Sequence, residues 1–305
     1  MLALPDSPTD PVKLADWLEL WALKSPEGNS SRGDLERALR PAALADLPTD
    51  DAIEKKTVSV LAELRDREKA AGMGYPFEIR GELLSTKPNW EEYPSYVFCL
   101  CLSYFGCKEK KGSKSFPRRW FEHLSRDALQ QYIGGRAVRF GSPRVKKELP
   151  QRFNDAVIYI CKTIKEGGDF QAGGLPNRQD DAVDIIAWKQ FPDELPGKLV
   201  LFGNCATERD WEGSKRTELQ PEAFCQDWMT HPPRCKIIKT LFIPHRIDRD
   251  RLLPNLGRAG IIFDRCRISY WTYFIGPTSQ HEKDKRPFAY APIAEWSRTA
   301  LQKGA

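Results

Sequence analysis

Residues 180–207 read DDAVDIIAWKQFPDELPGKLVLFGNCAT, and this stretch decides the fold. Its two apolar runs, residues 183–188 and 198–205, are rich in β-branched and aromatic residues, which is typical of buried strands. The connection between the runs contains two prolines and a glycine, which favours a turn. The sequence therefore predicts a buried hairpin at the centre of the chain.

An acidic cluster leads into the first strand of this hairpin. Asp180 and Asp181 precede the strand, and Asp184 lies inside the apolar run. Burying a carboxylate costs free energy unless it is paired, hydrogen-bonded or bound to a metal. We interpret Asp184 as a candidate metal ligand, with a structural ion pair as the alternative. Asp180 and Asp181 are interpreted as turn residues, although Asp181 is also a candidate ligand of a second metal.

Composition indicates a globular chain of one large domain or two ordinary ones, with 305 residues and 29% charged residues. A net charge of +5 suits a polyanionic partner, but a lysine-rich solvated surface would look the same. The eight cysteines form no CxxC pair, so we expect free thiols in a reducing cytosol. With no signal peptide and no apolar run of about 20 residues, we expect a cytoplasmic protein without membrane contact.

The hydrophobic periodicity outside the hairpin predicts an α/β fold. The expected helices cover residues 11–24, 52–71, 93–105, 119–133, 153–164, 221–228 and 292–301, with a short helix over 35–39 capped by Asp34. Further strands are expected over residues 77–84, 136–140, 236–243 and 258–265. These elements divide into a helical N-terminal region, residues 1–90, and a second domain, residues 91–305. A basic loop over residues 107–119 is either a solvated face or a phosphate contact.

The order of elements over residues 118–265 is α-β-β-β-α-β when the helix at 153–164 is taken as an insertion. This order resembles the core of the PD-(D/E)XK, or restriction-endonuclease-like, nuclease superfamily, and the resemblance covers about half the chain. It implies a mixed central sheet flanked by helices. It also implies an Asp on the second strand, a D/E-x-K motif on the third and a Glu from the first helix. In the family these groups hold one or two Mg²⁺ ions, which orient a water and stabilise charge on the phosphate.

Matched residue by residue, Asp184 takes the place of the strand Asp and Glu122 that of the helix Glu, so both are implied metal ligands. The third-strand motif falls at Asn204-Cys205-Ala206, where the chain departs from the pattern. An amide replaces the acid, as Gln does in some members, and alanine stands where the lysine belongs. The resemblance implies that the backbone carbonyl of Cys205 completes the metal coordination.

The missing lysine needs a substitute from another element. We expect Lys215 to take this role, with Glu218 one turn beyond it if the segment is helical. Lys198 is a second candidate, but it enters its strand at the opposite end. Relocated lysines and acids occur in the family, so the candidate catalytic residues are Asp184, Asn204, Lys215 and Glu218.

Several other residues have alternative readings. A nucleophilic Cys205 would need a base, and His123 is the only histidine on a neighbouring element, so we expect Cys205 in the core. Trp188 and Trp211 are expected to pack rather than stack on bases. Two arginines near the Gly-Ser-Pro turn at residues 141–143, Arg139 and Arg144, are candidate phosphate contacts.

The resemblance implies a Mg²⁺-dependent DNA endonuclease in which Mn²⁺ substitutes for Mg²⁺. The patterns Asp-x-x-Asp-Ile-Ile-Ala-Trp and Gly-x-Cys-Ala-Thr also resemble those of bacterial proteins that target DNA in defence, which implies an anti-phage or restriction role. The incomplete motif favours an alternative, a catalytically weakened nuclease fold that serves as a DNA-binding or assembly subunit. A third reading is an unrelated α/β domain with a structural acidic hairpin. Because a nuclease endangers its host, we expect a regulatory protein or ATPase partner, and the sequence leaves a homo-oligomer open.

Overall fold

The hairpin at the centre of the sequence is present in the computed structural model, which describes residues 2–7, 9–40, 49–107, 116–171, 181–273 and 290–303. Its strands are β5 (Ile185–Lys189) and β6 (Leu199–Cys205), paired antiparallel from Ile185 opposite Gly203 to Lys189 opposite Leu199. The described residues pack as two units. Unit 1 holds residues 1–117, 244–248 and 265–305, and unit 2 holds residues 118–243 and 249–264. The division thus falls at Pro117 rather than at residue 90, and the C-terminal stretch returns to unit 1.

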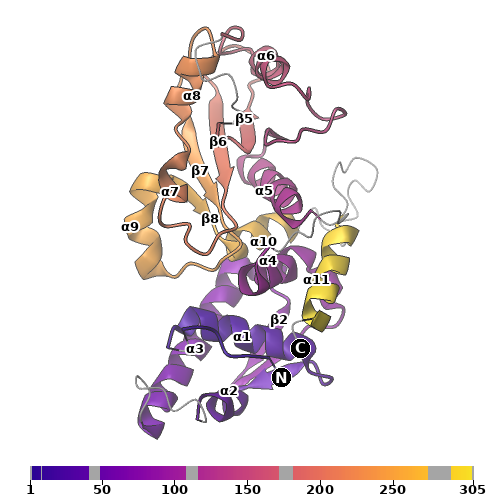
Figure 1. The fold of residues 1–305 in the computed structure, drawn as a ribbon, viewed down its shortest axis with the longest axis vertical. Coiled ribbons are helices and arrows are strands. Elements are labelled where there is room, and N and C mark those ends of the chain that lie inside the picture. The colour runs from indigo at the N-terminus through magenta and orange to yellow at the C-terminus, as the bar shows by residue number, and fades with distance from the viewer. Residues whose placement is uncertain are drawn as a thin grey trace. The chain divides into compact units, whose positions relative to one another are not determined.

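Unit 2 is built on a mixed five-stranded sheet of order β4-β5-β6-β7-β8 (Figure 1). β4–β5 and β5–β6 are antiparallel, whereas β6–β7 and β7–β8 are parallel. The remaining elements are α5 (Pro117–Ile133), β4 (Arg136–Arg139), α6 (Phe153–Ile164), α7 (Lys215–Glu218), α8 (Pro221–Trp228), β7 (Ile238–Phe242), α9 (Arg249–Ala259) and β8 (Ile261–Phe263). The expected α/β class is confirmed, and α6 and α8 begin and end at the expected residues.

The core of unit 2 lies between the hairpin and two helices. Trp188 of β5 and Phe202 of β6 pack with side chains of α6 and α8, including Ile160 and Phe224. Phe224 makes an edge contact with Phe202, with ring centroids 5.5 Å apart. This burial fixes which face of each strand points inward, because side chains alternate along a strand.

Unit 1 combines helices with an antiparallel sheet of order β1-β3-β2. Its elements are α1 (Pro11–Lys24), β1 (Asn29–Ser31), α2 (Arg32–Leu39), α3 (Asp50–Ala71), the 3₁₀ helix η1 (Gly72–Gly74), β2 (Phe77–Arg80), β3 (Leu83–Thr86), the 3₁₀ helix η2 (Trp90–Glu92), α4 (Pro94–Phe105), α10 (Arg265–Tyr273) and α11 (Ala291–Lys303). Among the residues that the structure describes, every helix is too short or too polar to span a lipid bilayer.

Two local expectations in unit 1 are corrected. The single strand expected over residues 77–84 is a hairpin, since Gly81 adopts a left-handed φ of 63° and reverses the chain between β2 and β3. The expected cap Asp34 lies inside α2, where its carboxylate accepts a hydrogen bond from the Ser31 backbone N–H. Ser31 is the N-cap, and the two residues form a reciprocal capping box.

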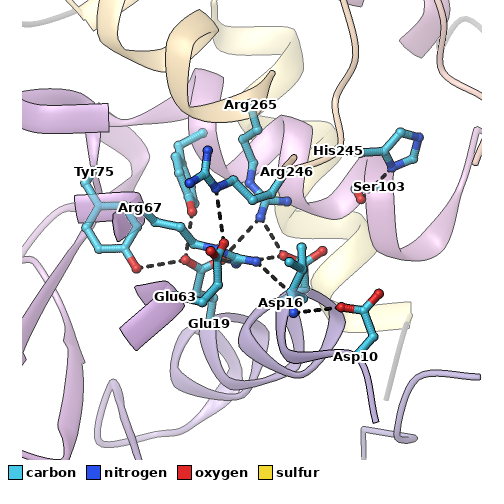
Figure 2. A network of polar contacts seen from close by, with 12 residues as sticks. Asp10, Asp16, Glu19, Glu63, Arg67, Tyr75, Ser103, His245, Arg246 and Arg265 are labelled. Atoms are coloured by element: carbon cyan, nitrogen blue, oxygen red, sulfur yellow. Dashed lines mark hydrogen bonds and ion pairs between the residues drawn. The ribbon is translucent and has the colours of Figure 1, made fainter. Parts of the chain in front are cut away.

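A buried cluster of charged residues joins α1, α3 and α10 within unit 1 (Figure 2). The Arg67 guanidinium lies 2.7 Å from Asp16, 2.8 Å from Glu19 and 2.7 Å from Glu63. Arg265 also donates to Asp16. Burial raises the pKa of Asp16, but Arg265 and Arg67 outweigh this and hold that pKa below its usual value. Each carboxylate of the cluster has an arginine partner, as a buried charge requires.

Replacing Arg67 with Met should leave Asp16, Glu19 and Glu63 without their shared partner. Removing one member of a buried ion pair costs about 3–5 kcal/mol of stability, so Arg67→Met should unfold at much lower urea concentration than the wild type. The matched control is Arg80→Met, because Arg80 pairs with Glu78 on the exposed surface. Equal urea midpoints for the two variants would contradict the structural role of the cluster.

Candidate functional site

A pocket of about 210 Å³ lies in unit 2 beside the ends of β5 and β6. Its walls come from α5, the turn before β5, the end of β6 and α7. The structure brings together in this pocket the six residues assigned as catalytic or metal-binding: Glu122, Asp184, Asn204, Cys205, Lys215 and Glu218. The other lining residues are Arg118, Ala182, Thr207 and Glu208.

Asp184 is held in place by backbone hydrogen bonds from two neighbouring strands. Its N–H donates to the Gly203 carbonyl at 2.8 Å, and its own carbonyl accepts from Phe140 and Gly141 at 2.7 and 3.1 Å. One carboxylate oxygen, Oδ2, accepts from the Cys205 N–H at 2.7 Å. The carboxylate is therefore fixed by the sheet, and its Oδ1 faces Gly141.

Glu122 of α5 is held by an arginine from β4. Arg139 Nε donates to Glu122 Oε2 at 2.6 Å, and Nη1 donates to the Pro143 carbonyl at 3.0 Å. Arg139 is 2% exposed, and among the described residues its Nη2 has no hydrogen-bond partner. Arg144 is also buried and lies 4.5 Å from the Phe140 ring centroid. Both arginines were candidate phosphate contacts, and both side chains are buried inside the fold.

The carboxylates of Glu122 and Asp184 converge at Gly141. A Cβ atom at Gly141 would lie 3.0 Å from Asp184 Oδ1 and 3.0 Å from Glu122 Oε2. The two oxygens are thus no farther apart than twice that distance, which is close enough to share one hydrated cation. A Cβ at this position would require the ends of both carboxylates to shift by a few tenths of an ångström.

Asn204 of β6 and Lys215 of α7 both contact one carboxylate oxygen of Glu218. Lys215 Nζ lies 2.7 Å from Glu218 Oε2, and Asn204 Nδ2 lies 3.5 Å from the same oxygen. The segment is a single turn of helix, α7, which places Lys215 and Glu218 on one face. The hydrogen bond to Glu218 raises the pKa of Lys215, with further contributions from Glu208 and Asp184, so the amine is charged at neutral pH.

A cysteine nucleophile does not fit this pocket. Burial raises the pKa of the Cys205 thiol well above its usual range, and Asp184 and Glu122 raise it further. Burial also lowers the pKa of His123 to about 3, helped by neighbouring arginines. A thiolate needs the opposite environment. Cys205 is half-buried and lines the pocket, whereas we expected it in the core.

The remaining candidates lie elsewhere. Asp181 adopts a left-handed φ of 50° and accepts from the Trp228 indole at 2.9 Å, so it is a turn residue with a structural partner. Lys198 is buried and donates to the Ile164 carbonyl, away from the pocket. Trp188 and Trp211 are buried, as expected. Asp180 and the lysines of the basic loop lie outside the described residues.

The donor set fits a magnesium-type cation better than a zinc-type one. Within the described ranges, no three His, Cys, Asp or Glu side chains gather into a metal-binding group. Mg²⁺ is commonly bound by one or two carboxylates and completes its shell with waters and substrate phosphates. Glu122 and Asp184 supply such a pair. Zinc prefers thiolate and imidazole, and the Cys205 thiol is neutral.

Comparisons with known proteins returned no relatives. No protein-family model matches the chain, and neither curated proteins nor solved structures gave a match.

The positions of two residues in the site were not predicted from the sequence. Arg139 was a candidate phosphate contact, and only the structure pairs it with Glu122. Gly141 read as the end of a strand, and only the structure gives it the two carboxylates as neighbours.

Gly141→Ala should weaken divalent-cation binding with little loss of stability. The added methyl group would shift the ends of the two carboxylates by a few tenths of an ångström, whereas the backbone at Gly141 is accessible to alanine. Calorimetric titration with Mn²⁺ should show at least tenfold weaker binding than the wild type. Gly257→Ala is the control, because a Cβ at Gly257 meets nothing within 4 Å. Wild-type Mn²⁺ affinity in Gly141→Ala would exclude the convergence point as the cation site.

Proposed function

We propose that unit 2 is a Mg²⁺-dependent nuclease domain that hydrolyses phosphodiester bonds in DNA, with Mn²⁺ able to replace Mg²⁺. One observation carries the proposal: residues assigned from separate elements of the sequence line one pocket. The order α5-β4-β5-β6-α8-β7 supports it, since it agrees with the α-β-β-β-α-β order of the restriction-endonuclease-like core. The antiparallel pairing of β4, β5 and β6 and the parallel β7 are compatible with its mixed sheet.

Glu122 and Asp184 would hold the cation, which would supply charge stabilisation at the phosphate and lower the pKa of a bound water. The backbone of Cys205 is well placed to contribute its carbonyl oxygen. Peptide groups alternate in direction along a strand, and the Gly203 carbonyl two residues earlier points to Asp184. The Cys205 carbonyl is then on the same side of β6 as Asp184.

Lys215 would replace the missing third-strand lysine. Its raised pKa keeps it charged, so it would orient the attacking water and stabilise phosphate charge rather than remove a proton. Glu218 holds Lys215 and is the acid nearest to Asn204, the position where the family pattern has a carboxylate. Attack of water on phosphorus would break the bond to the 3′-oxygen and leave a 5′-phosphate.

A second candidate function is a DNA-binding or assembly subunit with weakened catalysis. The pairing of Glu122 with Arg139 and of Lys215 with Glu218 favours it, because each pair must loosen or share its partner during a reaction. An anti-phage or restriction role, with a regulatory protein or ATPase partner, is proposed from the sequence patterns alone.

Purified protein should nick or linearise supercoiled plasmid in the presence of Mg²⁺ or Mn²⁺. Asp184→Asn removes a metal ligand while keeping the shape of the side chain, and it should lower the cleavage rate at least 100-fold. The control is Asp193→Asn in the exposed turn between β5 and β6. If neither the wild type nor Asp184→Asn cuts but both retard DNA on a gel, the binding-subunit function replaces the nuclease function. Equal cutting by both would refute the assignment of Asp184.

Lys215→Ala should lower the cleavage rate about 100-fold without changing the urea midpoint, because it removes a charge that acts on the reacting phosphate. Lys165→Ala is a matched control, since Lys165 forms a comparable exposed ion pair with Glu194 in unit 2. Cleavage at the wild-type rate by Lys215→Ala would show that the relocated lysine has no catalytic role.

A further inference from the structure

A second groove in unit 2 has unpaired positive charges. It has a volume of about 490 Å³ and lies between the segment after β4 and the start of α6, lined by residues 146–152, Asp155 and Tyr159. Lys146, Lys147 and Arg152 are exposed on its walls. Two carboxylates, Glu148 and Asp155, share the groove, so its cations outnumber its acids.

The three cations differ from the basic residues around the first pocket. There, Arg118, Arg139 and Lys215 each pair with a glutamate. Among the described residues, the side chains of Lys146, Lys147 and Arg152 form neither an ion pair nor a hydrogen bond. Since Glu148 and Asp155 lie beside them without pairing, these cations are free to bind an external anion.

The chain links this groove closely to the carboxylate pair. Gly141 contacts Asp184 and Glu122, and Lys146 follows only five residues later. Five residues span at most about 18 Å. Along the axis of a DNA helix each strand carries one phosphate per about 3.4 Å, so this span corresponds to about five nucleotides.

We propose that this groove binds the phosphate backbone of the nucleic-acid substrate, on one side of the bond to be cut. The inference rests on the proposed nuclease function and assigns its substrate contact. The cations neutralise two or three consecutive phosphates, and the 39% exposed ring of Tyr159 offers a flat surface beside them. A nucleic acid fits better than a single small anion because the cations lie along a groove.

The test is binding of a fluorescent 30-base-pair duplex in EDTA, followed by anisotropy over a range of salt concentrations. The triple variant Lys146→Ala, Lys147→Ala, Arg152→Ala should bind at least tenfold more weakly than the wild type. Each lost phosphate contact removes about 0.9 from the slope of log affinity against log salt, so that slope should fall by about 2–3. The matched control is Lys55→Ala, Arg65→Ala, Lys69→Ala, which removes the same charges from the exposed face of α3 in unit 1.

Failure of the groove proposal can be distinguished from failure of the nuclease function. Wild-type affinity and slope in the groove variant, with a wild type that binds and cuts DNA, would overturn the groove alone. Equal weakening by the groove and control variants would also overturn it, because only overall charge would then matter. A wild type that neither binds nor cuts nucleic acid would refute the nuclease function and the groove together.

Discussion

The register between β5 and β6 is the constraint on which the pocket depends. Asp184 is bound to β6 twice, through its backbone N–H to Gly203 and through its carboxylate to the Cys205 N–H. A slip of one residue would reverse every side chain of β5 and break both hydrogen bonds. Trp188 and Phe202 oppose such a slip, because it would turn Trp188 out of the cluster that the two residues share with α6 and α8. Core packing therefore fixes the position of the acid.

Arginine pairs with carboxylates in both units, with different consequences. In unit 1, Arg67 and Arg265 satisfy Asp16 and Glu19 inside the protein, and the cluster is closed. In unit 2, Arg139 reaches Glu122 from the protein side, while the glutamate still lines the pocket. The first arrangement stabilises a fold, whereas the second holds an acid in a pocket that remains open to a ligand. Both arrangements contain an arginine partner, so the difference between them is that Glu122 lines a pocket that a ligand can enter.

Local patterns in the sequence predicted the hairpin, most helices and the candidate residues, because periodicity and turn residues act over short distances. Helix α9 was missed since Pro254 lies inside it, and proline normally argues against a helix interior. The two units also differ from the division expected at residue 90. The return of residues 265–305 to unit 1 depends on contacts such as Arg265 with Asp16, which are distant in sequence. The same limit hid the pairing of Arg139 with Glu122.

The balance of charge in the pocket explains why a metal and outside contacts are both needed under the proposed function. Four carboxylates line the pocket, those of Glu122, Asp184, Glu208 and Glu218. Two lining cations, Arg118 and Lys215, and the buried Arg139 behind Glu122 oppose them. A phosphate entering this pocket alone would meet a net negative charge. One divalent cation reverses that sign, since it adds two positive charges between the acids and the phosphate. It does so only at the bond to be cut, so affinity for the rest of a nucleic acid must come from positive charge elsewhere on unit 2.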